Sequence, residues 1–134
     1  MRAAILLAAV LIGFSAPARA ADDAAAAKAV IQSQADAIGR DDAAAAYSFA
    51  APAIQALFPD PQIFMAMVRT GYPPVYRHRS FEFGGSRTVN GVIAQEVQIV
   101  DEEGAAWAAL YTLEQQPDGS LKITSCALRK LTTA

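Results

Sequence analysis

The chain is poor in cysteine and histidine, and both shortages restrict what it can be. Cys126 is the single cysteine, so a disulfide cannot form within the chain and the fold depends on its packed core. His78 is the single histidine, and one histidine with one cysteine does not fill a tetrahedral metal site when no acidic residues cluster beside them. We therefore expect neither a metal nor any other cofactor.

The sequence also lacks an apolar run long enough to span a membrane. The apolar stretch at residues 3–14 falls short of the ~20 residues that a spanning helix requires. Arg2 precedes this stretch, and Ala18 and Ala20 follow it in the small-x-small pattern of a signal-peptide cleavage site. We expect residues 1–20 to be a signal peptide that is cleaved after Ala20. The protein would then be periplasmic or secreted, without membrane attachment.

An excess of basic charge is missing as well. Removing Arg2 and Arg19 from the eleven basic residues leaves nine against thirteen acidic ones, a formal charge of −4 for residues 21–134. Binding to a phosphate backbone requires a basic face, so we expect no nucleic-acid partner. Residues 21–134 have about the commonest size of one domain and carry no linker or repeat, so a single domain is expected.

Alanine at helical spacing dominates the first half of this domain. An apolar stripe with intervals of three and four residues runs from Ala27 to Ile38. It predicts a helix that starts at Asp22 or Asp23, whose carboxylates suit a helix N-terminus, and ends at Gly39.

Three further signals predict shorter helices. Asp41 or Asp42 is expected to cap a segment that Pro52 closes, and a short helical turn follows this proline. Asp60, directly before a proline, marks the start of a helix that ends at Gly71. The next two residues after Tyr72 are prolines, which predict an extended crossing.

The second half changes to β-branched and aromatic residues in alternation. Four strands are predicted, at residues 77–85, 92–100, 105–115 and 121–131. Short turns join them, among them Asn90-Gly91, a strong hairpin signal. Consecutive strands with short turns form an antiparallel meander, and the fold class is therefore α+β, with the N-terminal helices packed on one face of a four-stranded sheet.

Strict alternation also predicts which residues share a face of the outer strands. In the first strand it groups Arg77, Arg79, Phe81 and Phe83 against His78, Ser80 and Glu82, and in the last strand Leu121, Ile123, Ser125 and Ala127 against Lys122, Thr124, Cys126 and Leu128. By the same rule Glu82 and Glu114 face water. The orientation of Glu96 is not fixed by its mixed neighbours.

Two long segments carry a resemblance to a known family. "FMAMVRTGYPPVYR" and "WAALYTLEQQPDGSLKITSCAL" resemble the bacterial domain-of-unknown-function family 4864 (DUF4864), small exported proteins. The architecture in turn is similar to the nuclear-transport-factor-2-like, or cystatin-like, cone fold. That resemblance implies a curved sheet around the helices with a pocket at the open end, and it implies no particular activity.

Aromatic and arginine residues around the helix-sheet junction are the candidate binding site. Aromatic side chains provide an apolar surface, and guanidinium groups at its rim can bind an anionic group. Such a site suits a small amphipathic or anionic ligand. The candidates are Tyr72, Tyr76, Arg77, Arg79, Trp107 and Tyr111. The alternative is that these aromatic rings fill the core while the arginines lie over them with their charged groups in water.

Three functions remain open from the sequence. The first is an exported, non-enzymatic domain that binds a small ligand or serves as an accessory, with no catalytic residue. The second is an isomerase-like or dehydratase-like enzyme, which needs Glu96 or His78 as an acid or base beside a pocket tyrosine. A Cys126 nucleophile assisted by His78 is a weaker form of this hypothesis. The third is a structural or interaction homodimer that packs through exposed sheet faces.

Overall fold

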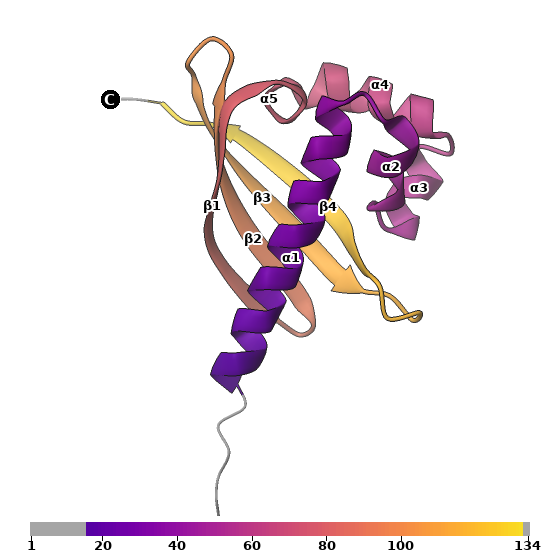
Figure 1. The fold of residues 1–134 in the computed structure, drawn as a ribbon, viewed down its shortest axis with the longest axis vertical. Coiled ribbons are helices and arrows are strands. Elements are labelled where there is room, and N and C mark those ends of the chain that lie inside the picture. The colour runs from indigo at the N-terminus through magenta and orange to yellow at the C-terminus, as the bar shows by residue number, and fades with distance from the viewer. Residues whose placement is uncertain (1–15, 133–134) are drawn as a thin grey trace, which may run out of the picture.

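The computed structural model describes residues 16–132, which form helices packed on one face of an antiparallel sheet (Figure 1). The helices are α1 (Ala16–Gly39), α2 (Ala43–Ser48), α3 (Pro52–Leu57), α4 (Pro61–Gly71) and α5 (Pro73–Tyr76). The strands are β1 (His78–Val89), β2 (Val92–Asp101), β3 (Ala106–Gln115) and β4 (Leu121–Lys130), in the spatial order β1-β2-β3-β4. The predicted α+β meander is confirmed. Most of the expected signal peptide lies outside the described residues.

Helix α1 lies across the inner face of the sheet and supplies the first layer of the core. Ala27, Ile31 and Ile38 are completely or almost completely buried, which confirms the predicted apolar stripe. The predicted start at Asp22 or Asp23 is wrong, because the helix already includes Ala16. Alanine is the strongest helix former, so nothing stops the helix from extending ahead of the two aspartates.

The shorter helices form a cluster at one end of the sheet (Figure 1). Asp42 caps α2 by accepting a hydrogen bond from the Ala45 amide at 3.1 Å, and Asp60 caps α4 through the Gln62 amide at 2.7 Å. The predicted extended crossing at Pro73 and Pro74 is wrong, since these residues open the short helix α5. Proline lacks an N–H group, but the first turn of a helix leaves that group unpaired in any case.

Two β-bulges overturn the predicted faces of the edge strands. In β1 the partners change from His78↔Asp101 to Ser80↔Val100, so Arg79 is an extra residue and His78 joins Phe81 on the inner face. The two rings lie 5.1 Å apart between centroids.

In β4 the partners change from Ile123↔Leu113 to Ser125↔Thr112, which makes Thr124 the extra residue. Ser125 and Ala127 are therefore exposed, and Cys126 and Leu128 take the inner positions instead. Side chains of a strand alternate between the two faces of the sheet, and this alternation is interrupted at a residue that has no partner on the neighbouring strand.

Glycine produces a third irregularity, between Phe83 and Ser86 of β1. Gly84 and Gly85 together oppose Glu96, and the buried side chain of Gln95 donates to both glycine carbonyls at 3.1 and 3.3 Å. The outer face of the sheet has no covering element among residues 16–132. Glu82 and Glu114 are exposed, as predicted. None of the described helices combines the length and apolarity needed to cross a membrane.

Candidate functional site

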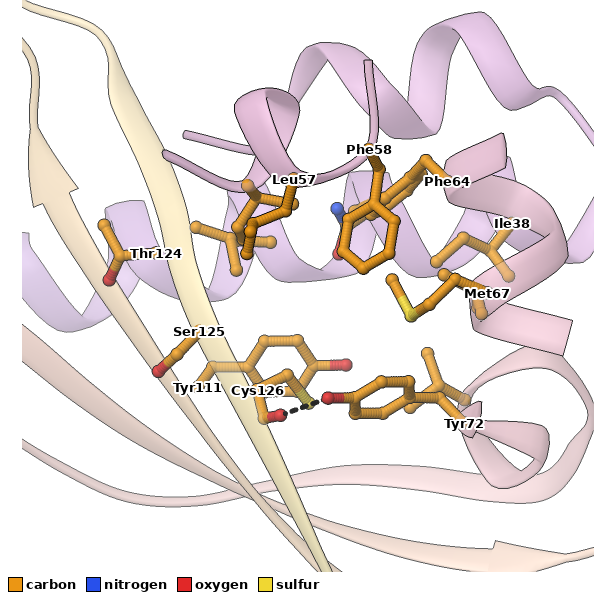
Figure 2. Close-up of a pocket in the computed structure, with 15 residues that line it drawn as sticks. Ile38, Leu57, Phe58, Phe64, Met67, Tyr72, Tyr111, Thr124, Ser125 and Cys126 are labelled. Carbon is orange, nitrogen blue, oxygen red and sulfur yellow. Dashed lines mark hydrogen bonds between the residues drawn. The ribbon is translucent and has the colours of Figure 1, made fainter. Parts of the chain in front are cut away.

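A cavity of about 310 Å³ lies between the helical cluster and strands β3 and β4 (Figure 2). Its walls come from α1, α3, α4, α5 and the two strands, and they consist of Gln34, Ile38, Ile54, Leu57, Phe58, Phe64, Met67, Val68, Tyr72, Val75, Tyr111, Ile123, Thr124, Ser125 and Cys126. No charged side chain belongs to this described lining. Such a cavity favours an apolar ligand that has few polar groups.

The bulge in β4 builds one wall of the cavity. Ile123, next to the bulge, donates from its amide to the Phe49 carbonyl at 2.9 Å and accepts from the Ala51 amide at 2.8 Å. These bonds attach the segment between α2 and α3 to β4. Beyond the bulge, the change of face turns Cys126 toward the cavity.

The roof of the cavity is α3 together with Phe58. None of the residues in α3 is buried, and Leu57 is 74% exposed although it also borders the cavity. The Tyr47 hydroxyl lies 2.7 Å from the Phe58 carbonyl oxygen and 3.2 Å from that of Gln55, while the Gln55 side chain donates to the Tyr47 carbonyl at 3.0 Å. Hydrogen bonds to Tyr47 therefore hold the roof, together with the packing of Ile54 and Phe58 against the core.

Three polar groups of the cavity, from Tyr72, Tyr111 and Cys126, lie close together (Figure 2). The Tyr72 hydroxyl donates to the Cys126 carbonyl oxygen at 3.0 Å, and the Tyr111 hydroxyl lies near the Cys126 thiol. Burial raises the pKa of the thiol to about 12, and burial likewise raises the pKa of Tyr72 and, much further, that of Tyr111. All three groups are therefore protonated at neutral pH, and the thiol has little nucleophilic character.

The structure divides the predicted aromatic cluster between two places. Tyr72 and Tyr111 line the cavity, whereas Tyr76, Arg77 and Trp107 border a separate hollow that, unlike the cavity, is lined by charged residues. That second hollow lies between α5 and the turn after β2. The Trp107 indole donates to the Asp101 carboxylate at 2.9 Å, which lowers the pKa of Asp101.

Arg77 is occupied by interactions within the protein. Its guanidinium carbon lies 3.8 Å from the centroid of the Tyr76 ring, and its Nη2 lies 3.3 Å from the Asp41 carboxylate. Asp41 also accepts hydrogen bonds from the Tyr76 hydroxyl at 2.7 Å and from Arg69 at 2.9 Å. Arg77 is therefore part of a cluster that joins the end of α1 to α4 and α5.

The remaining candidates lie away from the cavity. Arg79 is exposed at its bulge, with Nη1 beside Gly104. His78 is half-buried and its Nδ1 lies 3.0 Å from the Pro74 carbonyl oxygen, in a shallow surface hollow. Glu96 is exposed on the outer face of the sheet. Neither His78 nor Glu96 shares the cavity with a tyrosine.

Sequence reasoning missed Asp41 as the centre of a polar cluster. It treated Asp41 as one of two candidate caps, whereas Asp42 is the cap and Asp41 has a left-handed φ of 58°. Aspartate tolerates that conformation better than most residues, so an Asp-Asp pair just after the helix-ending Gly39 was the available signal.

The described residues offer no group of three or more histidine, cysteine, aspartate or glutamate side chains that could hold a metal ion. No curated protein and no solved structure matches the chain. The profile of one family, "Domain of unknown function (DUF4864)", matches residues 20–134. Since this match covers nearly the whole sequence, the chain belongs to the DUF4864 family.

Proposed function

We propose that the protein is a non-enzymatic domain that binds a small, mainly apolar ligand in the cavity between the helical cluster and β4. The main observation that supports this proposal is the lining of the cavity, which is apolar over most of its surface and uncharged throughout the described part. Ligand sites typically measure ~300–1,000 Å³ and combine apolar walls with a few polar groups. At about 310 Å³ the cavity lies at the small end of that range.

Its polar groups favour binding over acid-base catalysis. A general acid or base needs a pKa near the working pH, and burial moves the pKa of Tyr111 and of Cys126 well above it. The cavity also favours an amphipathic ligand over an anionic one, because Arg77 is engaged by Asp41 and an unpaired anion is costly to bury.

Export and a cone-like fold are further parts of the proposal. The family match begins at residue 20, next to the expected cleavage site after Ala20, which supports removal of a signal peptide. Intact mass of the protein recovered from the periplasm tests this, and an uncleaved N-terminus would contradict it. Relatedness to the nuclear-transport-factor-2-like fold is supported by the meander around α1 with a hollow at one end. An experimental structure that superposes poorly on that fold would refute it.

The binding proposal is tested with a neutral fluorescent probe and a cavity-filling variant. N-phenyl-1-naphthylamine should bind the wild-type protein with enhanced fluorescence. Cys126→Leu adds bulk inside the cavity and should weaken binding about tenfold or more, because the larger side chain takes space that the probe needs and a loss of ~1.4 kcal/mol is tenfold in affinity. Ala127→Leu is the matched control, since Ala127 is the next residue of β4 and is exposed on the opposite face.

Probe binding that is absent from the wild type, or equal in both variants, would overturn the proposal. Circular dichroism and thermal unfolding of each variant confirm that a loss of binding is not a loss of folding. Native mass spectrometry of freshly purified protein adds an independent readout, in which a bound mass disappears in Cys126→Leu and persists in Ala127→Leu.

A further inference from the structure

The hydroxyl of Tyr111 differs from that of Tyr72, because no oxygen or nitrogen atom of the described residues accepts a hydrogen bond from it. Tyr111 is 2% exposed, and its hydroxyl lies near the Cys126 thiol. Sulfur is a weak acceptor. Tyr72, by contrast, donates to a backbone carbonyl oxygen at 3.0 Å. Figure 2 draws the Tyr111 hydroxyl pointing into the space below Phe58 and Met67.

Because Tyr111 lines the cavity, a donor of this kind, without a strong acceptor in the protein, is available to a bound ligand. A ligand oxygen placed beside Tyr111 would provide the missing acceptor. Burial keeps this phenol protonated, so it remains a donor at every physiological pH.

A carbonyl oxygen fits this position better than a hydroxyl or a carboxylate. A hydroxyl would bring a second donor into the cavity, and that donor would need an acceptor of its own, which a carbonyl group does not. A carboxylate would be buried without a positive partner, because the described lining has no charged residue. A carbonyl group accepts a hydrogen bond from the Tyr111 hydroxyl and has no donor of its own to leave unpaired.

The volume sets the size of the ligand. An apolar cavity of about 150 Å³ binds benzene in another protein, so about twice that volume suits two fused rings. The volume of about 310 Å³ meets this condition.

We infer that the cavity takes an uncharged, mainly apolar carbonyl compound of about two-ring size, whose oxygen accepts a hydrogen bond from Tyr111. This inference rests on the proposed binding function and specifies the chemical class of its ligand. Tyr111 is then a specificity-determining residue rather than part of the core alone.

The test compares matched probes in matched variants. The probes are 2-acetylnaphthalene, with the carbonyl, 2-ethylnaphthalene, of similar shape without it, and the anion 2-naphthoate. Affinities for wild type, Tyr111→Phe and Tyr72→Phe are measured by calorimetry or by displacement of N-phenyl-1-naphthylamine. Comparing the ratio of acetyl to ethyl affinity between proteins cancels the different hydration of the two probes.

The expected result is a ratio that falls about fivefold from wild type to Tyr111→Phe, since a neutral hydrogen bond contributes ~1 kcal/mol. The ratio should stay unchanged in Tyr72→Phe, because that hydroxyl is already used within the protein. A ratio of acetyl to ethyl affinity that is equal in all three proteins would overturn the inference. If both probes still bind, the proposed function is upheld in that case. Tighter binding of 2-naphthoate than of 2-acetylnaphthalene would also overturn it.

Failure of every probe to bind would instead contradict the proposed function. A second readout does not depend on the folding of any variant. The carbonyl stretching frequency of 2-acetylnaphthalene bound to the wild type should shift to lower values than in a hydrocarbon solvent. A frequency equal to that in hydrocarbon would mean that no donor reaches the oxygen, and would refute the inference.

Discussion

The roof of the cavity should open more often when the Tyr47 hydroxyl is removed. This hydroxyl lies 2.7 Å from the Phe58 carbonyl oxygen and 3.2 Å from that of Gln55, on either side of the last turn of α3. Tyr47→Phe deletes the donor but keeps the ring, which packs against Phe64 with 5.7 Å between centroids. The substitution therefore tests the hydrogen bonds of the roof rather than its apolar packing.

The magnitude follows from one partly buried hydrogen bond. A single hydroxyl proton makes one good bond, with a net contribution of about 1 kcal/mol. Because α3 has no buried residue, its opening should be a local event with a low free energy. An added cost of about 1 kcal/mol raises the open population roughly fivefold.

Amide hydrogen exchange measures this population residue by residue. The amides of Ile54 and Gln55 bond to the Ala51 carbonyl at 3.0 and 3.1 Å, and the Phe58 amide bonds to the Ile54 carbonyl at 3.0 Å. These three amides should exchange about fivefold faster in Tyr47→Phe, while the amides of β2 and β3 remain unchanged.

The matched control is Ser48→Ala, the next residue along α2. Its hydroxyl is lost too, but it bonds to the Ala45 carbonyl within its own helix and not to the roof. This variant should leave exchange in α3 unchanged. Unchanged exchange of α3 in Tyr47→Phe, or equal acceleration in α3 and the central strands, would refute the idea of a locally opening roof.

Two further predictions concern pH and reactivity. Hydrogen bonds from Tyr76 and Arg69 hold the pKa of Asp41 below its usual value, so the stabilisation by Asp41 is present above the unfolded pKa and lost as the pH falls through the lower folded pKa. Urea unfolding between about pH 6 and pH 3 should show a smaller acid loss in Asp41→Asn than in wild type, and equal losses would contradict this. Because burial raises the pKa of Cys126 to about 12, iodoacetamide should alkylate the folded protein at about pH 8 far more slowly than the urea-unfolded chain. Equal rates would argue against a buried thiol.

Much of the architecture could be predicted because its signals are local. The spacing of Ala27, Ile31 and Ile38 gives the inner face of α1, and the Asp60-Pro61 pair gives the start of α4. Asn90 and Gly91 both have the positive φ that a tight hairpin requires. In each case a few neighbouring residues decide the outcome, and tertiary contacts do not change it.

The site was harder to predict because it depends on contacts between distant segments. Tyr72 and Cys126 are joined by a hydrogen bond across 54 residues, and Tyr76 meets Asp41 across 35. Composition marks tyrosine and arginine as suitable for binding, but it does not say that Arg77 is held by a carboxylate. The predicted cluster therefore contained two true cavity residues and a set that belongs to another part of the surface.

The bulge in β4 connects a pattern in the sequence with the wall of the cavity. Its inner residues are Leu121, Ile123, Cys126 and Leu128, so the interval between them is two, then three, then two. An interval of three within a strand is what an extra residue produces, and the interval from His78 to Phe81 around the Arg79 bulge is also three. A prediction that followed this change of interval, and did not impose strict alternation, would have placed Cys126 on the inner face of the sheet. The cavity wall follows from that step, because the same irregular segment of β4 carries the bonds to Phe49 and Ala51 that bring α3 over the sheet.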